Sequence, residues 1–413
     1  MARSLFSIER IVVNAPAFYD IEIAPNRAMV GVKLDGEHRV FDYTEPATEE
    51  QKSALFGTLA DREVVGYNNR GFDTFLLGMI QNGATPRSVY EFGQAIIESN
   101  TPSWQLARER KVQAAAFDEI DLMHFCPRGR LKAYEGRLGL EIRDLPFDPH
   151  ADICAALYPT VERYLLHDLD ATEALHRRLE PEFNIRRQLE TKFGVTDLLK
   201  KTAARSAEAI LISEYLKLET TVERADIRDS ARRCRHFDFP FDVPDWITKV
   251  CRGTPAEALI DAINGTMFSV DNGRRPIPDR EWPSHIEIDS GVNVKFGLGG
   301  LHTDDPEMRF VDIEGADFGS YYPHLFLRPS CMPGYLNPAS LGNVYQTIIE
   351  DRLSAKASGD KITADALKLI INATFGLTGD SYSSLYFPPS FLNITVGGQL
   401  LLIAMTDKLR RAH

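Results

Sequence analysis

Cysteine is scarce in this chain of 413 residues, and the few that occur are scattered. No two cysteines form a C-x-x-C pair, and an odd number cannot all be paired. The pattern therefore argues against a disulfide framework and against a structural zinc site. Reduced thiols fit a cytosolic protein best. The five cysteines are Cys126, Cys154, Cys234, Cys251 and Cys331.

The sequence also lacks a signal peptide, a long apolar run and an excess of positive charge. The first ten residues already carry Arg3, Glu9 and Arg10, and no run approaches the length that we expect of a membrane span. We therefore expect a cytoplasmic protein that does not bind membranes. The formal net charge of −12 excludes a surface that is basic overall. It does not exclude a nucleic-acid enzyme, because binding grooves are local and metal sites are themselves acidic.

The chain is long enough for two or three domains, and 44% of its residues are hydrophobic. We expect strands at residues 11–13, 17–23, 28–34, 39–43, 63–67 and 120–125, with a turn at 35–37. We expect helices at 48–59, 161–179 and through much of 180–218. Residues 219–295 show no clear pattern and are interpreted as a connector.

Two carboxylates lie two residues apart on the predicted strand 17–23. Side chains alternate along a strand, so Asp20 and Glu22 point to the same face. Like charges on one face of an apolar run repel each other, and a divalent metal between them would relieve that repulsion. The alternative is an edge strand with a solvated acidic face.

Two later segments place acidic residues at defined points of helices. Residues 68–77 read as a polar turn with an asparagine cap followed by a helix, so Asp73 lies in a first turn, where the helix dipole favours an anion. It could equally be a plain helix-start carboxylate. On the predicted helix 161–179, Tyr164 and Asp168 are four residues apart and share a face. Asp170 points elsewhere and is expected to be solvated.

Three segments, in this order, resemble the exonuclease motifs of family B DNA polymerases. They are D-I-E at Asp20 and Glu22, N-x-x-F-D at residues 69–73, and Y-x-x-x-D at residues 164–168. Each motif alone is weak, whereas all three in order, in fitting strand and helix settings, are specific. The resemblance implies an α/β fold in which a ribonuclease H-like domain, a mixed sheet flanked by helices, precedes a partial α+β polymerase palm with short helical fingers.

The resemblance also implies 3′–5′ exonuclease chemistry with two Mg²⁺ or Mn²⁺ ions per active site. Such a pair activates water and holds the leaving oxygen of a phosphodiester. Tyr164 would orient the water, and His167 beside the motif would be structural. Asn69 and Phe72 would hold the single-stranded 3′ end of the DNA. The implied metal ligands are Asp20, Glu22, Asp73 and Asp168.

The segment 311–323 resembles the first palm motif of the same family, D-x-x-S-L-Y-P, with Tyr321 in the leucine position. Asp317 would be catalytic and bind both metals at the incoming nucleoside triphosphate. Ser320 and Tyr321 would lie at the nucleotide, and the ring of Tyr322 would close off the space of a ribose 2′-hydroxyl. The alternative is a strand that ends in an aromatic turn.

Residues 368–376 resemble the fingers motif K-x-x-x-N-S-x-Y-G, with alanine and phenylalanine in the serine and tyrosine positions. Lys368 and Asn372 would bind the nucleotide, with Arg352 and Lys356 of the preceding predicted helix 344–357 as further cations. Phe375 and Gly376 would contact the DNA base pair.

Two loops could contact the DNA backbone. Gly299 and Gly300 lie in a glycine-rich stretch that permits close approach to a phosphate chain, although a plain tight turn would have the same composition. Residues 128–132 form a basic patch that is either a phosphate contact or a solvated loop.

A palm needs a second aspartate for its metals, and no segment after Asp317 supplies the family's Y-x-D-T-D hairpin. Either the chain is a truncated product, or it is the N-terminal part of a split polymerase; we expect a second polypeptide that carries this motif and the thumb. The expected substrates are single-stranded 3′ ends, primer–template DNA and deoxynucleoside triphosphates. The short distance from Asp317 to Lys368 argues against protein priming, and the compact layout resembles phage enzymes.

The predicted layout has five parts. Residues 1–180 form the exonuclease domain, 181–305 a connector, 306–337 the palm, 338–376 the fingers and 377–413 a palm helix. Two other functions stay open: a stand-alone 3′–5′ exonuclease with a vestigial palm, and a non-catalytic nucleic-acid-binding subunit of a replication complex.

Overall fold

The computed structural model describes residues 15–127, 129–145, 148, 150–288, 292–303 and 318–412. The chain divides into two compact units, Met1–Asn184 and Ile185–His413. The predicted strand 11–13, Arg128 of the basic patch and Asp317 lie outside the described residues.

The first unit is built on a mixed sheet. Within its described residues the strand order is β3-β2-β1-β4-β5. β1, β2 and β3 are antiparallel neighbours, whereas β1 pairs with β4, and β4 with β5, in parallel. The turn between β2 and β3 places Asp35 and Gly36 at positive φ, as a tight two-residue hairpin turn requires. The strands are β1 (Ala17–Ala24), β2 (Arg27–Leu34), β3 (Glu37–Tyr43), β4 (Glu63–Gly66) and β5 (Asp118–Asp121).

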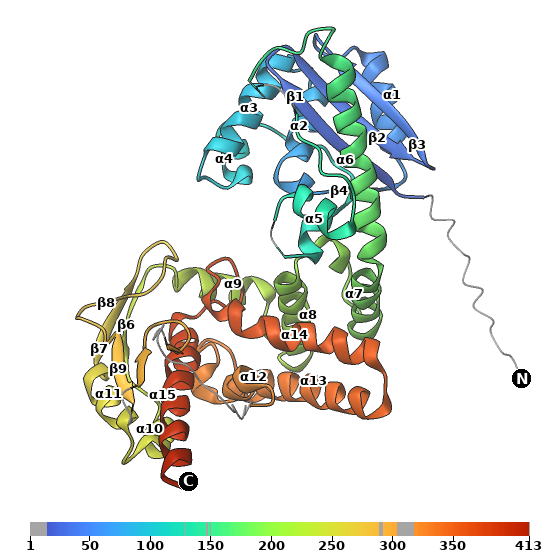
Figure 1. The fold of residues 1–413 in the computed structure, drawn as a ribbon. Helices are drawn as coiled ribbons and strands as arrows, with labels where there is room; N and C mark the ends of the chain where they lie inside the picture. The colour runs from blue at the N-terminus through green and yellow to red at the C-terminus, as the bar shows by residue number, and fades with distance from the viewer. Residues whose placement is uncertain are drawn as a thin grey trace, which may run out of the picture. The chain divides into compact units, whose positions relative to one another are not determined.

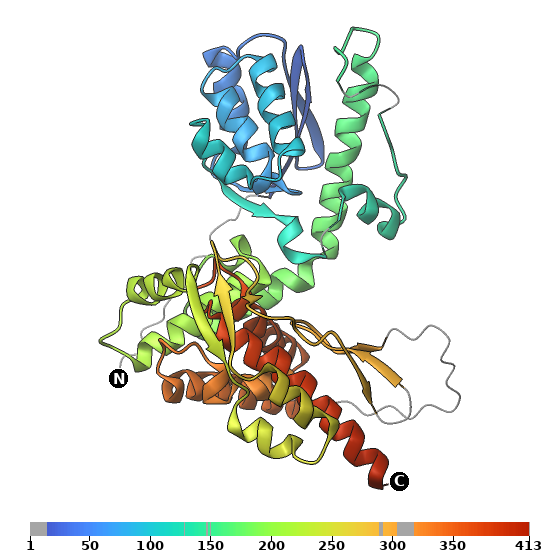
Figure 2. The same cartoon turned by 90° about the vertical axis from the view of Figure 1, so that its left-hand side faces the viewer.

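Helices cover both faces of this sheet, so the unit is a mixed α/β layer structure. Figure 2 views the sheet edge-on, with α1, α2 and α3 (blue) on one side and α6 (green) on the other. The apolar residues of α1–α3 form one core with Tyr19, Ile21 and Val30, and those of α6 form a smaller core with Met29. The helices are α1 (Glu49–Leu59), α2 (Asp73–Gln81), α3 (Pro86–Glu98), α4 (Ser103–Glu109), α5 (Leu131–Leu138) and α6 (Tyr158–Arg178), with 3-10 turns at Asn69–Gly71 and Leu122–Phe125.

The second unit is mainly helical, with small sheets. α8, α13 and α14 share a large apolar core, and the strands β6 and β7 pack with α10, α11 and α15 in another. Its helices are α8 (Ala203–Leu218), α9 (Arg224–Arg233), α10 (Asp245–Cys251), α11 (Pro255–Ile263), α12 (Tyr321–Phe326), α13 (Pro338–Ser358), α14 (Lys361–Gly379) and α15 (Pro388–Ala412); α7 (Glu180–Phe193) runs through the boundary between the units. Its strands are β6 (Phe237–Phe241), β7 (Thr266–Val270), β8 (Ile277–Pro278), β9 (His285–Ile288), β10 (Val292–Lys295) and β11 (His302–Thr303), with 3-10 turns at Leu198–Lys200 and Pro329–Cys331 (Figure 1).

Among the described residues, α15 alone has the length and apolar composition of a membrane span, with a mean hydropathy of 1.3 over its most apolar window. The expectation that no run approaches a span was therefore wrong by this measure. The helix is 61% buried in that window, and Leu400 and Ile403 lie in the core beside α10 and α11. A helix buried to this extent, with its apolar residues in a core, packs as a core helix.

Three local expectations were wrong. The predicted strand 120–125 ends at Asp121, where the Asp121 carboxylate accepts the backbone N–H of Met123 and starts a 3-10 turn. The N-cap residue of α2 is Phe72 rather than an asparagine. Residues 219–295 are not irregular: phenylalanines alternate along β6, and with Phe268 of β7 they pack in a core that α15 shares.

Candidate active site

Three of the predicted acidic residues converge at one point of the first unit. One carboxylate oxygen from each of Asp20, Glu22 and Asp168 lies within 4.8 Å of the other two. Asp168 is 7% exposed, and its Oδ1 has no hydrogen-bond partner in the described residues. Residues 146 positions apart in sequence therefore form a single acidic group.

Strand alternation and one glycine bring these acids together. Tyr19 and Ile21 face the helices α1–α3, so Asp20 and Glu22 face α6, which carries Asp168. Asp20 pairs with Gly31 on β2. A Cβ at Gly31 would lie 2.9 Å from both Leu165 and Leu169 of α6, so only glycine lets the helix approach the sheet this closely.

Asp73, in the turn after β4, lies near this group but is not one of the three acids whose oxygens lie within 4.8 Å of one another. It occupies the first turn of α2 and is 5% exposed. Burial, and then the charge of Asp20, raise the pKa of Asp73 well above its ordinary value, and Glu22 contributes in the same direction. Because β4 runs parallel to β1 and Val65 pairs with Phe18, β4 ends next to the middle of β1, where Asp20 lies, and the turn after β4 brings Asp73 toward it.

Burial raises the pKa of every acid in this group, and repulsion by neighbouring carboxylates adds to this for Glu22, Asp73 and Asp168. Burial raises the pKa of Asp20 to about 6. Burial, together with the charge of Asp20, raises the pKa of Asp168 to about 8. The pKa of Glu22 also lies well above its ordinary value, through burial and then the charges of Asp20 and Asp168. Such a group gains electrostatically from a bound cation.

Tyr164 lies next to this acidic group, one helical turn before Asp168. Burial, and then the charges of Asp168 and Glu22, raise the pKa of the Tyr164 phenol, and the interaction of its hydroxyl with the Asp168 carboxylate adds to this rise. The hydroxyl therefore keeps its proton at neutral pH and is available as a hydrogen-bond donor.

Lys132 is a cation close to these acids. Its charge lowers the pKa of both Glu22 and Asp168, and its Nζ lies 5.2 Å from the centre of the Tyr164 ring. Its ammonium group also pairs with Asp144. This lysine belongs to the basic patch of the sequence, and the fold places it beside the carboxylates.

The donor set fits a hard divalent cation. Carboxylate oxygens are the ligands that Mg²⁺ and Mn²⁺ prefer, and an unpartnered buried oxygen such as Asp168 Oδ1 has coordination capacity to spare. Asp20, Glu22 and Asp168 would hold the ion, with Asp73 next to them.

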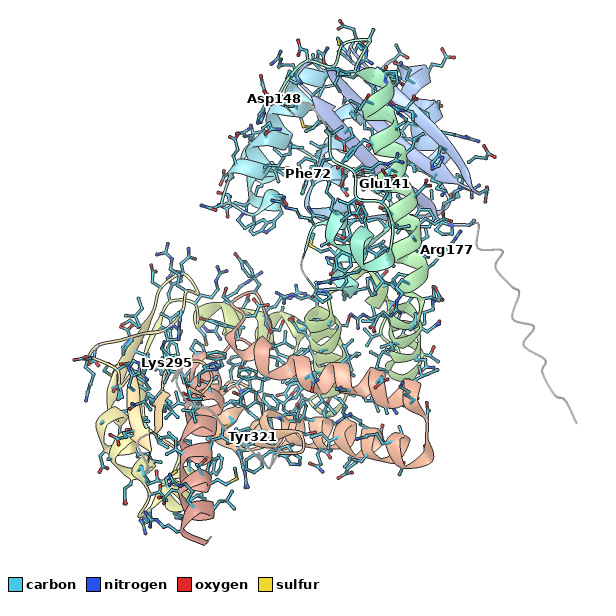
Figure 3. All side chains as sticks on the ribbon, in the orientation of Figure 1. Phe72, Glu141, Asp148, Arg177, Lys295 and Tyr321 are labelled. Carbon is cyan, nitrogen blue, oxygen red and sulfur yellow. The ribbon has the colours of Figure 1, made fainter. Side chains whose placement is uncertain are left out.

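The side chains of Asn69 and Phe72 are less exposed to solvent than we expected for residues that contact DNA. Asn69 is 0% exposed; its Nδ2 donates to Glu119 at 3.2 Å, and its Oδ1 has no partner in the described residues. The ring of Phe72 packs beside Gly93, and Figure 3 shows it next to α2. The DNA-binding role of both residues stays a prediction.

Sequence reasoning missed Glu119, Asp121 and Glu135. Glu119 accepts hydrogen bonds from Asn69 and Thr74 and pairs with Arg70. Asp121 accepts the backbone N–H groups of Asn68 and Met123. Glu135 on α5 is fully buried, and its charge raises the pKa of Asp168. The acidic residues of β5 were a sequence signal for Glu119 and Asp121. Nothing in the local sequence indicated a role for Glu135.

Two neighbours of Asp168 turn away from the acidic group. His167 Nε2 lies 2.7 Å from the backbone oxygen of Glu141. Figure 3 shows Glu141 beside α6. Asp170 is half exposed, as expected for its face of the helix, but it is ion-paired with Lys33 at 2.5 Å and His38 at 2.8 Å.

In the second unit the structure brings together two pairs of the predicted nucleotide-site residues. Arg352 Nη1 lies 3.5 Å from Ser320 Oγ, and the ring of Tyr322 lies 4.7 Å from that of Phe375. Tyr321 instead donates to the backbone oxygen of Gly398 on α15, the helix beside which it appears in Figure 3.

The other predicted contact residues of this unit are exposed, and within the described residues no side-chain hydrogen bond, ion pair or ring contact joins them to one another. Gly299 and Gly300 lie in a loop that Gln399 holds through its amide. The exposed residues are Lys356, Lys368, Asn372, Gly376, Gly299 and Gly300.

No protein-family model matches this chain, and no curated protein matches it at a significant level.

Proposed function

We propose that this chain is the N-terminal part of a family B DNA polymerase and that its first unit, a ribonuclease H-like domain, is a 3′–5′ exonuclease. The observation that carries the proposal is the convergence of Asp20, Glu22 and Asp168, with Asp73 adjoining. Their order in the sequence and their settings on a strand, a helix start and a helix are those of the three motifs.

The residues divide the work of hydrolysis between them. Asp20, Glu22, Asp73 and Asp168 would hold two divalent ions, which when bound would lower the pKa of water and stabilise negative charge on the leaving oxygen. Tyr164 keeps its proton and donates a hydrogen bond that orients the water. The turn that carries Asn69 and Phe72 would hold the single-stranded 3′ end, as the second motif implies.

The second unit is proposed to supply template-directed synthesis. Ser320 with Arg352, and Tyr322 with Phe375, would bind the incoming nucleotide, together with Asp317, Lys356 and Lys368. A polypeptide that carries the second palm aspartate and a thumb would complete this site.

Digestion of a 5′-labelled single strand tests the exonuclease. We expect stepwise shortening from the 3′ end in Mg²⁺ or Mn²⁺ and none in a chelator. Asp20→Ala with Glu22→Ala should lower the rate about a thousandfold or more, because the charge that stabilises the reacting phosphate is lost with the ions. Glu45→Ala with Glu50→Ala removes two exposed carboxylates and is the matched control.

The outcomes also separate the alternatives. Metal-dependent digestion with no nucleotide incorporation, even with the complementing polypeptide, would favour a stand-alone exonuclease. DNA binding with no digestion under any metal condition would favour a non-catalytic subunit and contradict the proposed reaction.

A further inference from the structure

The second unit contains a pocket of about 360 Å³ to which no function has yet been assigned. Of the residues predicted to contact DNA or nucleotide, Gly299 alone is among its described lining residues. The walls come from the loop after β7, the glycine-rich loop, the end of α14 and the start of α15. They consist of Gly273, Arg274, Arg275, Pro276, Leu298, Gly299, Gly379, Tyr386, Pro388 and Phe391.

The walls of this pocket are fixed by hydrogen bonds and close packing. Gly273 has φ +67° and donates its N–H to the backbone oxygen of Arg235 at 2.8 Å; a Cβ there would lie 2.5 Å from Ser381 Cβ. On the opposite wall, Gln399 Nε2 donates to the backbone oxygens of Gly297 and Gly299 at 2.7 and 2.8 Å. The pocket is therefore formed before any ligand arrives.

Polar groups at the pocket are left unsatisfied. Tyr386 is 2% exposed, and its hydroxyl has no hydrogen-bond partner in the described residues. Arg235 Nε is also buried without such a partner, and it would lie 3.2 Å from a Cβ at Gly273. A buried donor without an acceptor is unfavourable, and a ligand oxygen or ring nitrogen would remove that cost.

Charge and aromatic surface meet at the pocket. The exposed Arg274 and Arg275 form no ion pair with any described residue. Phe391 stacks on Phe375, with ring centres 5.4 Å apart and planes at 11°, and Phe375 in turn contacts Tyr322. A row of rings thus leads from the predicted nucleotide site to the pocket.

We propose that this pocket binds one unstacked nucleotide of a single DNA strand. The base lies against Tyr386 and Phe391, and its phosphates lie at Arg274 and Arg275, because flat aromatic ligands with attached anions suit aromatic walls with a cationic rim. The choice of a DNA strand rather than a free mononucleotide rests on the proposed function, since the row of rings connects the pocket to the predicted nucleotide site.

Photocrosslinking in the full chain tests the pocket directly. A short oligonucleotide with 5-iodouracil is irradiated with the protein in a chelator, so that digestion does not compete, and the crosslinked peptides are mapped by mass spectrometry. We expect crosslinks at Tyr386 or Phe391. Arg274→Ala with Arg275→Ala should lower their yield about tenfold, because two phosphate contacts are lost. Lys249→Ala with Arg252→Ala changes the charge equally at two exposed positions, on α10 and directly after it, and should leave the yield unchanged.

Other outcomes would overturn the assignment. Absence of crosslinks in residues 379–391, or an equal yield in the Arg274/Arg275 variant, would exclude this pocket as a nucleotide site. Crosslinking by 5-iodo-deoxyuridine monophosphate but not by the oligonucleotide would contradict the strand and indicate a mononucleotide site. Digestion by the first unit is measured separately: crosslinks without digestion leave the pocket standing and contradict the exonuclease, and digestion without crosslinks does the reverse.

Discussion

Tyr164 tests the proposed chemistry at the scale of a single residue. Its hydroxyl lies beside the Asp168 carboxylate, whose charge raises the phenol's pKa, so Tyr164→Phe removes one donor and leaves the carboxylates in place. We expect the turnover of single-stranded DNA to fall roughly a hundredfold, the scale of a lost proton-handling or water-orienting group, with little change in KM. Tyr158→Phe on the same helix removes a hydroxyl that contacts Glu162 and should have little effect. A change in KM alone would assign Tyr164 to substrate binding.

Glu119 is a positioning residue for Asn69. It holds the amide of Asn69, the hydroxyl of Thr74 and the guanidinium of Arg70, and it therefore fixes the turn that carries Asn69 and Phe72. We expect Glu119→Ala to raise KM for a single-stranded 3′ end about tenfold. Glu119→Gln, which can still accept hydrogen bonds, should recover most of the affinity. If both variants lose turnover and affinity equally, Glu119 acts on the fold rather than on Asn69.

At the scale of secondary-structure elements, the close packing of α6 on β2 at Gly31 can be tested. The contact between β2 and α6 sets the distance from Asp20 to Asp168, and a Cβ at Gly31 would meet Leu165 and Leu169 at 2.9 Å. Gly31→Ala should therefore move α6 outward, destabilise the fold by about 1–3 kcal/mol and lower digestion more steeply than stability. Gly57→Ala on α1 is the control, because no neighbour lies within 4 Å of its added Cβ and alanine favours a helix. Thermal unfolding and digestion rates measure the two effects, and full activity in Gly31→Ala would mean that the helix spacing is not critical.

For the whole molecule, the acidic cluster links stability to pH and to metal. The folded-state pKa of Asp20 is about 6 and that of Asp168 about 8, and both are raised from the ordinary value of 3.8. Between about pH 4 and pH 8 the folded protein therefore binds more protons than the unfolded chain. The stability of the metal-free protein should therefore fall as pH rises from about 4 to about 8. Each pKa unit corresponds to about 1.4 kcal/mol. Hydrogen exchange of β1 and β2 amides, corrected for intrinsic rates, measures this loss.

Divalent metal should reverse that trend. Mg²⁺ competes with protons for the same oxygens, so it should stabilise β1 and β2 more at pH 8 than at pH 5. Asp168→Asn should weaken both the pH dependence in chelator and the protection by Mg²⁺. Equal protection by Mg²⁺ in wild type and Asp168→Asn would place the ion elsewhere.

Local chemistry in the sequence determined much of the first unit. The alternation in residues 17–34, the tight turn at Asp35 and Gly36, and the helical spacing of Tyr164 and Asp168 depend on neighbouring residues. These patterns predicted the central strands, the first turn of α2 and the helix α6, because strand and helix periods are properties of short segments.

Tertiary structure alone decided which distant groups meet. The parallel pairing of β1 with β4, the approach of α6 over Gly31 and the position of Lys132 beside the acids depend on contacts between segments far apart in the chain. The raised pKa values depend on the same contacts, because burial and charge repulsion are set by neighbours in space. For the same reason residues 219–295 gave no readable pattern: their strands and helices are stabilised by burial against α15 rather than by local propensity.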